Sequence, residues 1–472
     1  MKKSLLAVAA MTAFAGAAQA QSSVTVYGIL DVGYIGSNSS VTNGNAAGAV
    51  ASYNYANTAA VTNTAAYPNS NVKNQQSLLG QSAEQTSRLG FKGTEDLGGG
   101  TSAFFTVEFG LTPQDQTLSG NTTGGLKNRQ SFVGLKKNGL GDAAVGMQYT
   151  PLHIAVGKTD PGQQNNMTGS VIYTGQADSG VVGAAGGNAN AYTSRVANAL
   201  TLNSEVLAGF QGHAIAVLNN NNQTAQDATA NTSGLVNIGN ITYGGNTNTN
   251  GWGLGLDYTW NKLFATANYT SLKQLTSATN CLPASTAAIS GSTAAASATA
   301  GGSCNTAVFN AGGAYVTNMG VIGTGIASQP LNIQDNQTYV GATYDFGILK
   351  AYASWISRKA QDTANSSFYQ KRQAEQIGVR SFVTPTVEAW ASAGVGTFTP
   401  MGFNQNSAHF NAWQLGTNYW LSKRTNVYGI FGQYAQANAT YQSAITGTAG
   451  SGANLQTSVN ANSYAVGVRH TF

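Results

Sequence analysis

The sequence has little charge. Only 8% of its 472 residues are Asp, Glu, Lys or Arg, whereas a soluble domain usually has about 25%. Proline (8 residues) and cysteine (2) are also scarce, but glycine (58) and tyrosine (21) are abundant. Past residue 20, no apolar run approaches the ~20 residues that a membrane-spanning helix needs. Because low charge also argues against disorder, we expect an all-β chain whose strands face an apolar medium on one side.

The first 20 residues have the three parts of a secretory signal peptide. Lys2 and Lys3 form a basic start, a short apolar run follows, and residues 18–20 form a small-x-small cleavage site. We therefore predict a cleaved leader at 1–20 and one exported domain at 21–472. Without the two leader lysines the chain has 20 basic and 17 acidic residues. This balance is too mild to indicate a nucleic-acid partner.

The only two cysteines are Cys281 and Cys304, which lie 23 residues apart in a polar stretch. In an exported protein, such a pair more often forms a disulfide than a metal site. No His, Asp or Glu lies between or beside them. We therefore predict a loop-closing disulfide, no metal and no cofactor.

Alternation of apolar and polar residues predicts sixteen strands. In residues 252–260, for example, Trp, Leu, Leu, Tyr and Trp alternate with Gly, Gly, Asp and Thr. The predicted strands are 23–36, 81–95, 101–112, 127–137, 142–150, 195–204, 207–219, 251–260, 263–275, 336–346, 348–359, 371–383, 386–398, 408–420, 425–436 and 461–472.

The connections between these strands are alternately short and long. The longest are 37–80, 151–194 and 276–335. Short turns at one rim and long loops at the other are typical of bacterial outer-membrane barrels. Lipid cannot hydrogen-bond a sheet edge, so we expect a closed antiparallel transmembrane barrel with both termini at the periplasmic rim. The alternative is a soluble, secreted protein of stacked hairpins, but aromatic residues such as Tyr258 and Trp260 cluster near the short turns and favour the barrel.

Charged residues share the strand face opposite the apolar set. This is expected of a water-filled barrel, because a lipid-facing Lys or Arg at mid-membrane costs about 2–4 kcal/mol. Glu375 is the exception, because strand alternation places it on the same face as the apolar Ile377. We expect it near the loop rim or at a subunit contact. The residues predicted to face the lumen are Arg88, Lys92, Glu108, Arg129, Asp257, Lys350, Arg380 and Glu388.

Counting from the short turns puts Arg88, Glu108 and Arg129 at one height on adjacent strands. Arg195, two strands further on, lies near the same height. Two interpretations are open. Either Glu108 neutralises the arginines and orders the wall, or the arginines form a basic wall at the narrowest point and set the ion preference.

Several segments resemble the trimeric general porins of Gram-negative outer membranes, of the type common in beta-proteobacteria. The matching segments are 23–28 (SVTVYG), 87–100 (SRLGFKGTEDLGGG), 129–135 (RQSFVGL), 421–425 (LSKRT) and 467–472 (GVRHTF). The resemblance implies a sixteen-stranded barrel, a homotrimer in contact with outer-membrane lipid and lipopolysaccharide, and passive diffusion of small hydrophilic solutes. It also implies that the third long loop, 151–194, folds into the lumen, and that the insertion machinery recognises the terminal Phe472.

In this family, wall arginines face acidic groups on the third loop. By motif, the arginines are Arg88 and Arg129, and the loop acids are Asp160 and Asp178. The chain has Met147 where the family usually has a further arginine, and Arg195 is the candidate to replace that charge. We therefore predict a weakly anion-selective diffusion channel, with a substrate-specific channel or a surface-loop adhesin as alternatives.

The sequence gives little support to an enzyme. No evident Ser or Asp arrangement surrounds any of the four histidines. These are His153, His213, His409 and His470.

Overall fold

The computed structural model describes residues 23–44, 70–115, 117–119, 125–174, 191–227, 241–279, 308–309, 315–316, 331–363, 366, 369–402, 407–441 and 455–472. The predicted leader, the two cysteines and Asp178 lie outside these residues. The elements are β1 (Ser23–Gly44), β2 (Ser70–Gln81), β3 (Arg88–Gly98), β4 (Thr101–Gly110), β5 (Lys127–Lys137), β6 (Gly141–Tyr149), α2 (Pro151–Thr159), β7 (Arg195–Ser204), β8 (Phe210–Asp227), β9 (Ile241–Trp260), β10 (Leu263–Thr279), β11 (Val308–Phe309), β12 (Tyr315–Val316), β13 (Leu331–Asp345), β14 (Lys350–Asp362), β15 (Tyr369–Phe382), β16 (Val387–Gly402), β17 (Ala408–Trp420), β18 (Thr425–Tyr441) and β19 (Leu455–Thr471).

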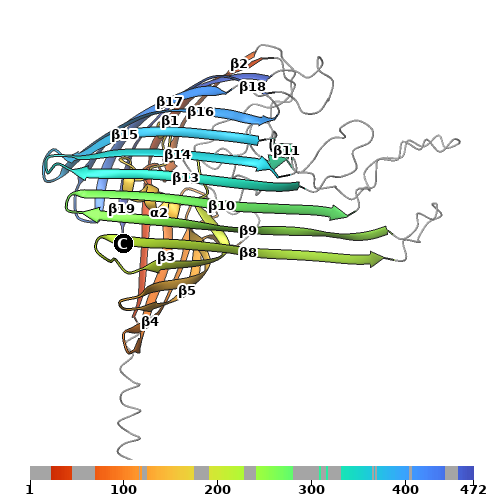
Figure 1. The fold of residues 1–472 in the computed structure, drawn as a ribbon. Helices are drawn as coiled ribbons and strands as arrows, with labels where there is room; N and C mark the ends of the chain where they lie inside the picture. Colours follow the sequence, from red (N-terminus) through yellow and green to blue (C-terminus); the bar gives the residue numbers. More distant parts are fainter. Residues whose placement is uncertain are drawn as a thin grey trace, which may run out of the picture.

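The described strands form a closed antiparallel barrel (Figure 1). One edge of β1 pairs with β19, and its other edge pairs first with β3 and then with β2. Because β2 and β3 share one position in the wall, the seventeen strands of the large sheet fill sixteen positions. At the seam, Gly28 and Phe472 exchange two backbone hydrogen bonds of 3.1 Å. The predicted sixteen-stranded architecture is confirmed.

The prediction of one continuous strand at 81–95 is wrong, since the wall is interrupted between β2 and β3 at 82–87. Several other strands extend beyond their predicted ends toward the long loops. For example, β9 begins at Ile241 rather than at residue 251. These extensions are rich in Asn, Thr and Gly, and Asn250 donates to Asn220 across β9 and β8 (2.9 Å). Outside the membrane a strand needs no apolar face, so the alternation on which the prediction depends is lost.

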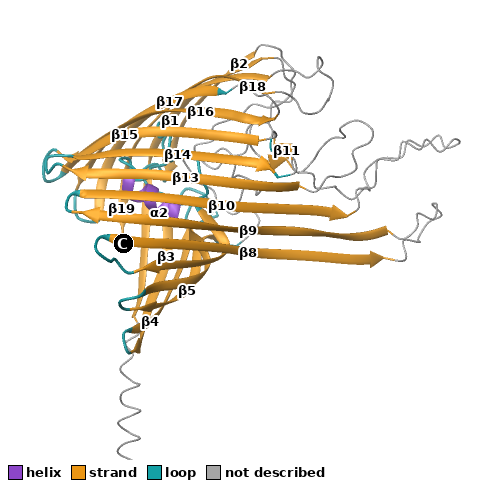
Figure 2. Ribbon diagram, viewed as in Figure 1, coloured by secondary structure: helices purple, strands orange, loops and turns teal. Residues whose placement is uncertain are grey.

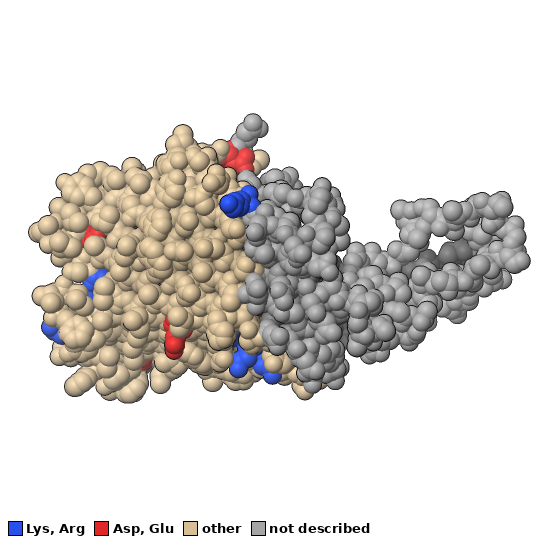
Figure 3. Space-filling model, turned by 90° about the horizontal axis from the view of Figure 1, so that it is seen from above, with Lys and Arg blue, Asp and Glu red and all other residues tan. Residues whose placement is uncertain are grey.

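The face of the wall that is seen in Figure 3 carries few charged residues. Side chains such as Leu254, Ile377 and Val466 are more than half exposed on it, as a lipid-facing surface requires. Outward aromatic residues occur near the short turns and again toward the long loops. The first group contains Tyr258, Trp260, Tyr344 and Tyr419, and the second contains Tyr34, Trp252, Trp355 and Tyr464.

The third long loop enters the barrel and forms α2, which lies within the ring of strands (Figure 2). The hydroxyl of Thr150 accepts from the backbone N–H of His153 (3.2 Å), and Pro151 follows this cap, which is a favourable helix start. The expectation that this loop folds into the lumen is confirmed for 151–174 and 191–194. No helix in the described part of the chain is long and apolar enough to cross a bilayer.

Candidate pore constriction

The third loop packs against one side of the lumen. Leu152 and Val156 of α2, together with Val171, lie in a buried apolar cluster with wall residues that include Tyr339 and Phe410. The loop is thus attached to the β13–β18 side through a hydrophobic core inside the barrel. A cavity is left on the opposite side, beside β3–β7.

Three wall glutamines hold the main chain of this loop. Gln337 accepts from the backbone N–H of Thr193 (2.8 Å), and Gln376 accepts from that of Val171 (3.0 Å). Gln414 donates to the carbonyl oxygens of Met167 and Thr168 (both 2.7 Å). All three glutamine side chains are buried, so these hydrogen bonds satisfy backbone groups that would otherwise be costly to bury.

Gly432 lets the loop approach the wall closely. A Cβ built on Gly432 would overlap the carbonyl oxygen of Thr168, whereas a Cβ on Gly429 of the same strand meets nothing nearer than 3.8 Å. Gly432→Val is therefore expected to displace the loop and to cost about 1–3 kcal/mol of stability. Urea unfolding of detergent-solubilised protein measures this cost. Gly429→Val is the matched control and should stay close to wild type; equal losses in both variants would contradict the close-approach argument.

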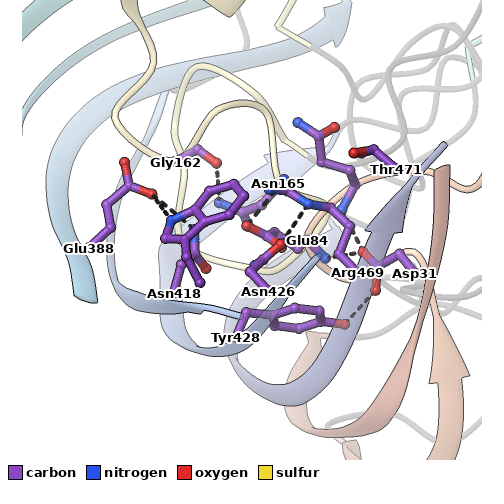
Figure 4. A network of polar contacts seen from close by, with 12 residues as sticks. Asp31, Glu84, Gly162, Asn165, Glu388, Asn418, Asn426, Tyr428, Arg469 and Thr471 are labelled. Atoms are coloured by element: carbon purple, nitrogen blue, oxygen red, sulfur yellow. Dashed lines mark hydrogen bonds and ion pairs between the residues drawn. The ribbon is translucent and has the colours of Figure 1, made fainter. Parts of the chain in front are cut away.

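The interruption at 82–87 supports the loop, and its Glu84 lies in a polar network with Asn426 and Arg469 (Figure 4). The Asp31 carboxylate accepts from the backbone N–H groups of Glu84 (2.8 Å) and Gln85 (2.6 Å) and from the Tyr428 hydroxyl (2.6 Å). Asn166 of the third loop in turn donates to the carbonyl oxygen of Ser82 (2.7 Å). The backbone groups lost from the strand ladder are thus satisfied by a buried acid, which explains why the wall tolerates the break.

A cavity of about 290 Å³ lies between the third loop and the β3–β7 wall. Its basic lining residues are Arg88, Lys127, Arg129 and Arg195, and no acidic side chain among the described residues lines it. The arrangement is an opening with positive charge on one wall. Such a site attracts small anions and repels cations.

The arginines are oriented by neighbours on adjacent strands. Arg129 donates through Nε to Glu108 (2.7 Å) and through Nη2 to the Tyr149 hydroxyl (2.7 Å). Glu108 is buried, and it also accepts from the Tyr27 hydroxyl (3.1 Å). Arg195 lies directly opposite Tyr149 in the strand register, with its guanidinium 5.8 Å from the ring centre. Glu108 therefore lies behind the lining and compensates one of its positive charges.

Asp160 does not face the arginines, and this expectation is wrong. Its carboxylate accepts from Gln376 of β15 (3.0 Å) and from the backbone N–H of Gln164 (2.6 Å), and the residue is buried. Burial raises the pKa of Asp160. The acid thus fixes the loop to the far wall and is turned away from the cavity.

The other predicted lumen residues face inward. Asp257 binds Lys158 of α2 (2.6 Å) and lies 3.3 Å from His213. Arg380 binds Glu388 (2.7 Å) and donates to the carbonyl oxygen of Pro161 (2.7 Å). Lys92 and Lys350 lie over the rings of Tyr27 and Tyr352, respectively, each at 5.4 Å. The described residues contain no group of three or more His, Cys, Asp or Glu side chains that could hold a metal.

Sequence reasoning missed several residues that line the cavity, among them Lys127, Tyr149 and His153. Lys127 lies two residues before Arg129, so strand alternation predicts that both side chains lie on the same face of the wall. His153 gave none, because its position depends on a helix that the strand pattern does not indicate.

The imidazole of His153 stacks on Tyr149, with ring centres 4.4 Å apart, and lies in the field of the arginines. Burial, and then Arg195 and Arg129, hold the pKa of His153 well below its usual value of 6.5. At neutral pH the ring is therefore uncharged.

Ion selectivity is accordingly expected to be unchanged between about pH 7.5 and about pH 5.5, because His153 adds no positive charge on acidification. Reversal potentials in a salt gradient measure this. A rise in anion preference at the lower pH that disappears in His153→Asn would contradict the assignment.

A family model described as Gram-negative porin matches residues 7–303 and 282–440. The chain belongs to the Gram-negative porin family. Its barrel is therefore one of the bacterial outer membrane, and the sequence-based expectation of family and location is confirmed.

The porin is 34% identical over 165 residues to an outer membrane porin protein of Bordetella pertussis. The alignment covers 34% of this chain and 37% of the Bordetella protein. It is 37% identical over 151 residues to outer membrane porin protein 32 of Delftia acidovorans. That alignment covers 32% of this chain and 33% of the Delftia protein. These alignments span only about a third of the relatives' own lengths. An anion-selective porin from Comamonas acidovorans has the same fold, with a TM-score of 0.57, 19% identity and coverage of 96% of this chain and 100% of the other.

Proposed function

We propose that this porin is a passive, water-filled diffusion channel for small hydrophilic solutes and ions, with a weak preference for anions and no enzymatic turnover. The observation that carries the proposal is the composition of the cavity lining, which has four basic residues and no described acidic one. The arginines are held by their neighbours before any ion arrives, so no reorganisation opposes passage. The orientation of Asp160 toward the far wall removes the acid that was expected to oppose the arginines.

The comparisons support both parts of the proposal. The relatives in Bordetella and Delftia are named as outer membrane porins. The barrel from Comamonas with the same fold is described as anion-selective. Arg88, Arg129 and Arg195 are the residues to which we assign the preference, and Lys127 joins them on the lining.

Reversal potentials across a KCl gradient, with purified protein in planar bilayers, test the ion preference. We expect a potential that favours chloride, and cation preference would overturn the basic-wall assignment. Swelling of liposomes with sugars of graded size tests general diffusion. Rates should fall smoothly with solute size, whereas saturation by a single solute would favour a substrate-specific channel.

We also propose a homotrimer, as the family resemblance implies, and a role for Phe472 in insertion. Phe472 exchanges two backbone hydrogen bonds with Gly28 at the seam, which supports a role for this residue in joining the two ends of the sheet. Crosslinking in native outer membranes tests the trimer, and deletion of Phe472 tests insertion. Cleavage after residue 20 and the pairing of Cys281 with Cys304 remain predictions from the sequence.

A further inference from the structure

Residues 82–87 form a bend that lines the cavity as well as supporting the third loop. Gln81 at the end of β2 and Ser82, Gln85 and Thr86 of the bend line the same cavity as the arginines of β3–β7. These four side chains carry amide and hydroxyl groups and no charge. The bend therefore forms an uncharged flank of the passage, between the basic wall and the third loop.

Both ends of the bend are bound to one residue of β1. The chain leaves the strand ladder at Ser82, whose φ of 60° lies in the left-handed region. The backbone N–H of Ser82 donates to the carbonyl oxygen of Asp31 (2.9 Å), and the backbone N–H of Asp31 donates to the Ser87 hydroxyl (3.0 Å). The Asp31 carboxylate binds the middle of the bend through Glu84 and Gln85. Displacing the bend would leave these buried groups unpaired, so it is held firmly against the wall.

The third loop holds the bend from the other side. The backbone N–H of Asn166 donates to the carbonyl oxygen of Ala83 (3.0 Å), and its side-chain amide donates to the Thr86 hydroxyl (3.0 Å). Ala83 is buried in an apolar cluster that includes Met167 of the loop. The bend and the loop thus form one continuous boundary, and a solute that passes beside them meets a fixed opening.

The side chain of Gln85 does not take part in this attachment. Its backbone N–H is bound by Asp31, but its amide forms no hydrogen bond with any residue in the described part of the chain. The residue is half-buried and lines the cavity. Glu84 beside it binds Asn426 and Arg469 instead (Figure 4). Gln85 is therefore the residue of the bend whose side chain can contact a solute without disturbing the fold.

We propose, on the basis of the diffusion-channel function above, that the bend at 82–87 is a second constriction element beside the third loop and that Gln85 sets its size limit. In a cavity of about 290 Å³, a side chain of this length narrows the opening and so limits the largest solute that passes. Because its amide is neutral, Gln85 selects by size and leaves the ion preference to the arginines.

Swelling of liposomes that contain the full-length protein tests the size limit. Gln85→Ala shortens the side chain, so the rate with a trisaccharide relative to that with a pentose should rise several-fold. Gln85→Trp fills the opening and should lower both this relative rate and the single-channel conductance several-fold. Gln75→Ala and Gln75→Trp are the matched controls, because Gln75 is an exposed residue of β2 outside the cavity lining. Both controls should behave as wild type.

Gln85→Glu tests the position of the side chain independently of its size. Glutamate has nearly the same shape as glutamine, but its charge would lie on the cavity that the arginines line. The chloride-to-potassium permeability ratio should fall about tenfold, which is the effect of a unit charge about 6 Å from each passing ion in water. Reversal potentials measure this ratio, and Gln75→Glu should retain the wild-type value.

A wild-type size limit in both Gln85→Ala and Gln85→Trp would overturn the proposal, and so would equal changes in the Gln75 controls. An unchanged permeability ratio in Gln85→Glu would also overturn it, because the side chain would then lie outside the passage. Failure of the channel function itself gives a different result. Wild type would then saturate with a single solute or admit no sugar, whichever residue occupies position 85.

Discussion

Replacing Glu108 with glutamine is expected to make the channel more anion-selective, and replacing Arg129 with glutamine to make it less so. The Glu108 carboxylate lies 2.7 Å from Nε of Arg129, so each change leaves one charge of the pair uncompensated beside the passage. A unit charge about 5 Å from a passing ion contributes about 0.8 kcal/mol at the dielectric constant of water. The charge attracts one ion and repels the other, so the difference between chloride and potassium is about 1.6 kcal/mol. The chloride-to-potassium permeability ratio should therefore change about 15-fold in each direction.

Reversal potentials at about 0.1 M KCl measure this ratio under conditions in which screening extends over about 10 Å. The control is Glu108→Gln/Arg129→Gln, which retains the net charge of wild type and should have a similar ratio. Arg88→Gln and Arg195→Gln should act in the same direction as Arg129→Gln, because both residues line the same cavity. If all variants give the wild-type potential, the Glu108–Arg129 pair orders the wall and does not set the preference.

Asp335→Asn is expected to have the largest effect on stability. Asp335 is fully buried on β13 and accepts from Arg358 through Nε (3.1 Å) and Nη2 (2.7 Å). It also accepts from Gln337 (3.0 Å), which in turn holds Thr193 of the third loop. Removing the charge takes the Asp335 carboxylate from the buried guanidinium of Arg358, which costs about 3–5 kcal/mol. Urea unfolding of the protein in detergent micelles measures the loss.

The double variant Asp335→Asn/Arg358→Gln separates the pair from its surroundings. It removes both charges and should recover a large part of the stability, because the unpaired charge is the main penalty. A loss below about 1 kcal/mol in Asp335→Asn would mean that the pair is hydrated and weak. No recovery in the double variant would place the cost in the hydrogen bonds that reach Gln337 and Thr193.

The wall of this protein could be predicted from the sequence because lipid imposes a strict rule on it. Residues such as Arg88 and Arg380 must face away from hydrocarbon, so the alternation of the strand alone predicts that they face the lumen. Counting from the short turns also placed Glu108 and Arg129 together, since strand register converts sequence distance into height. These inferences require only the periodicity of a strand.

The interior could not be predicted in the same way. Asp160 lies buried on the third loop, and its contact with Gln376 rather than with the arginines depends on tertiary packing. The break at 82–87 depends on Asp31, more than fifty residues away in sequence, as an acceptor for backbone N–H groups. Helix α2 did have a local signal in Thr150 and Pro151, but it is short and is stabilised mainly by the apolar cluster.

The glutamines of the wall bind peptide groups of the third loop in addition to its side chains. The peptide contacts do not depend on the identity of the residues that they hold. Substitutions at His153 or Ile154, which line the cavity, can therefore change which solutes the channel admits while the peptide contacts keep the loop in place. The lining of the passage and the attachment of the loop are thus separate parts of the structure.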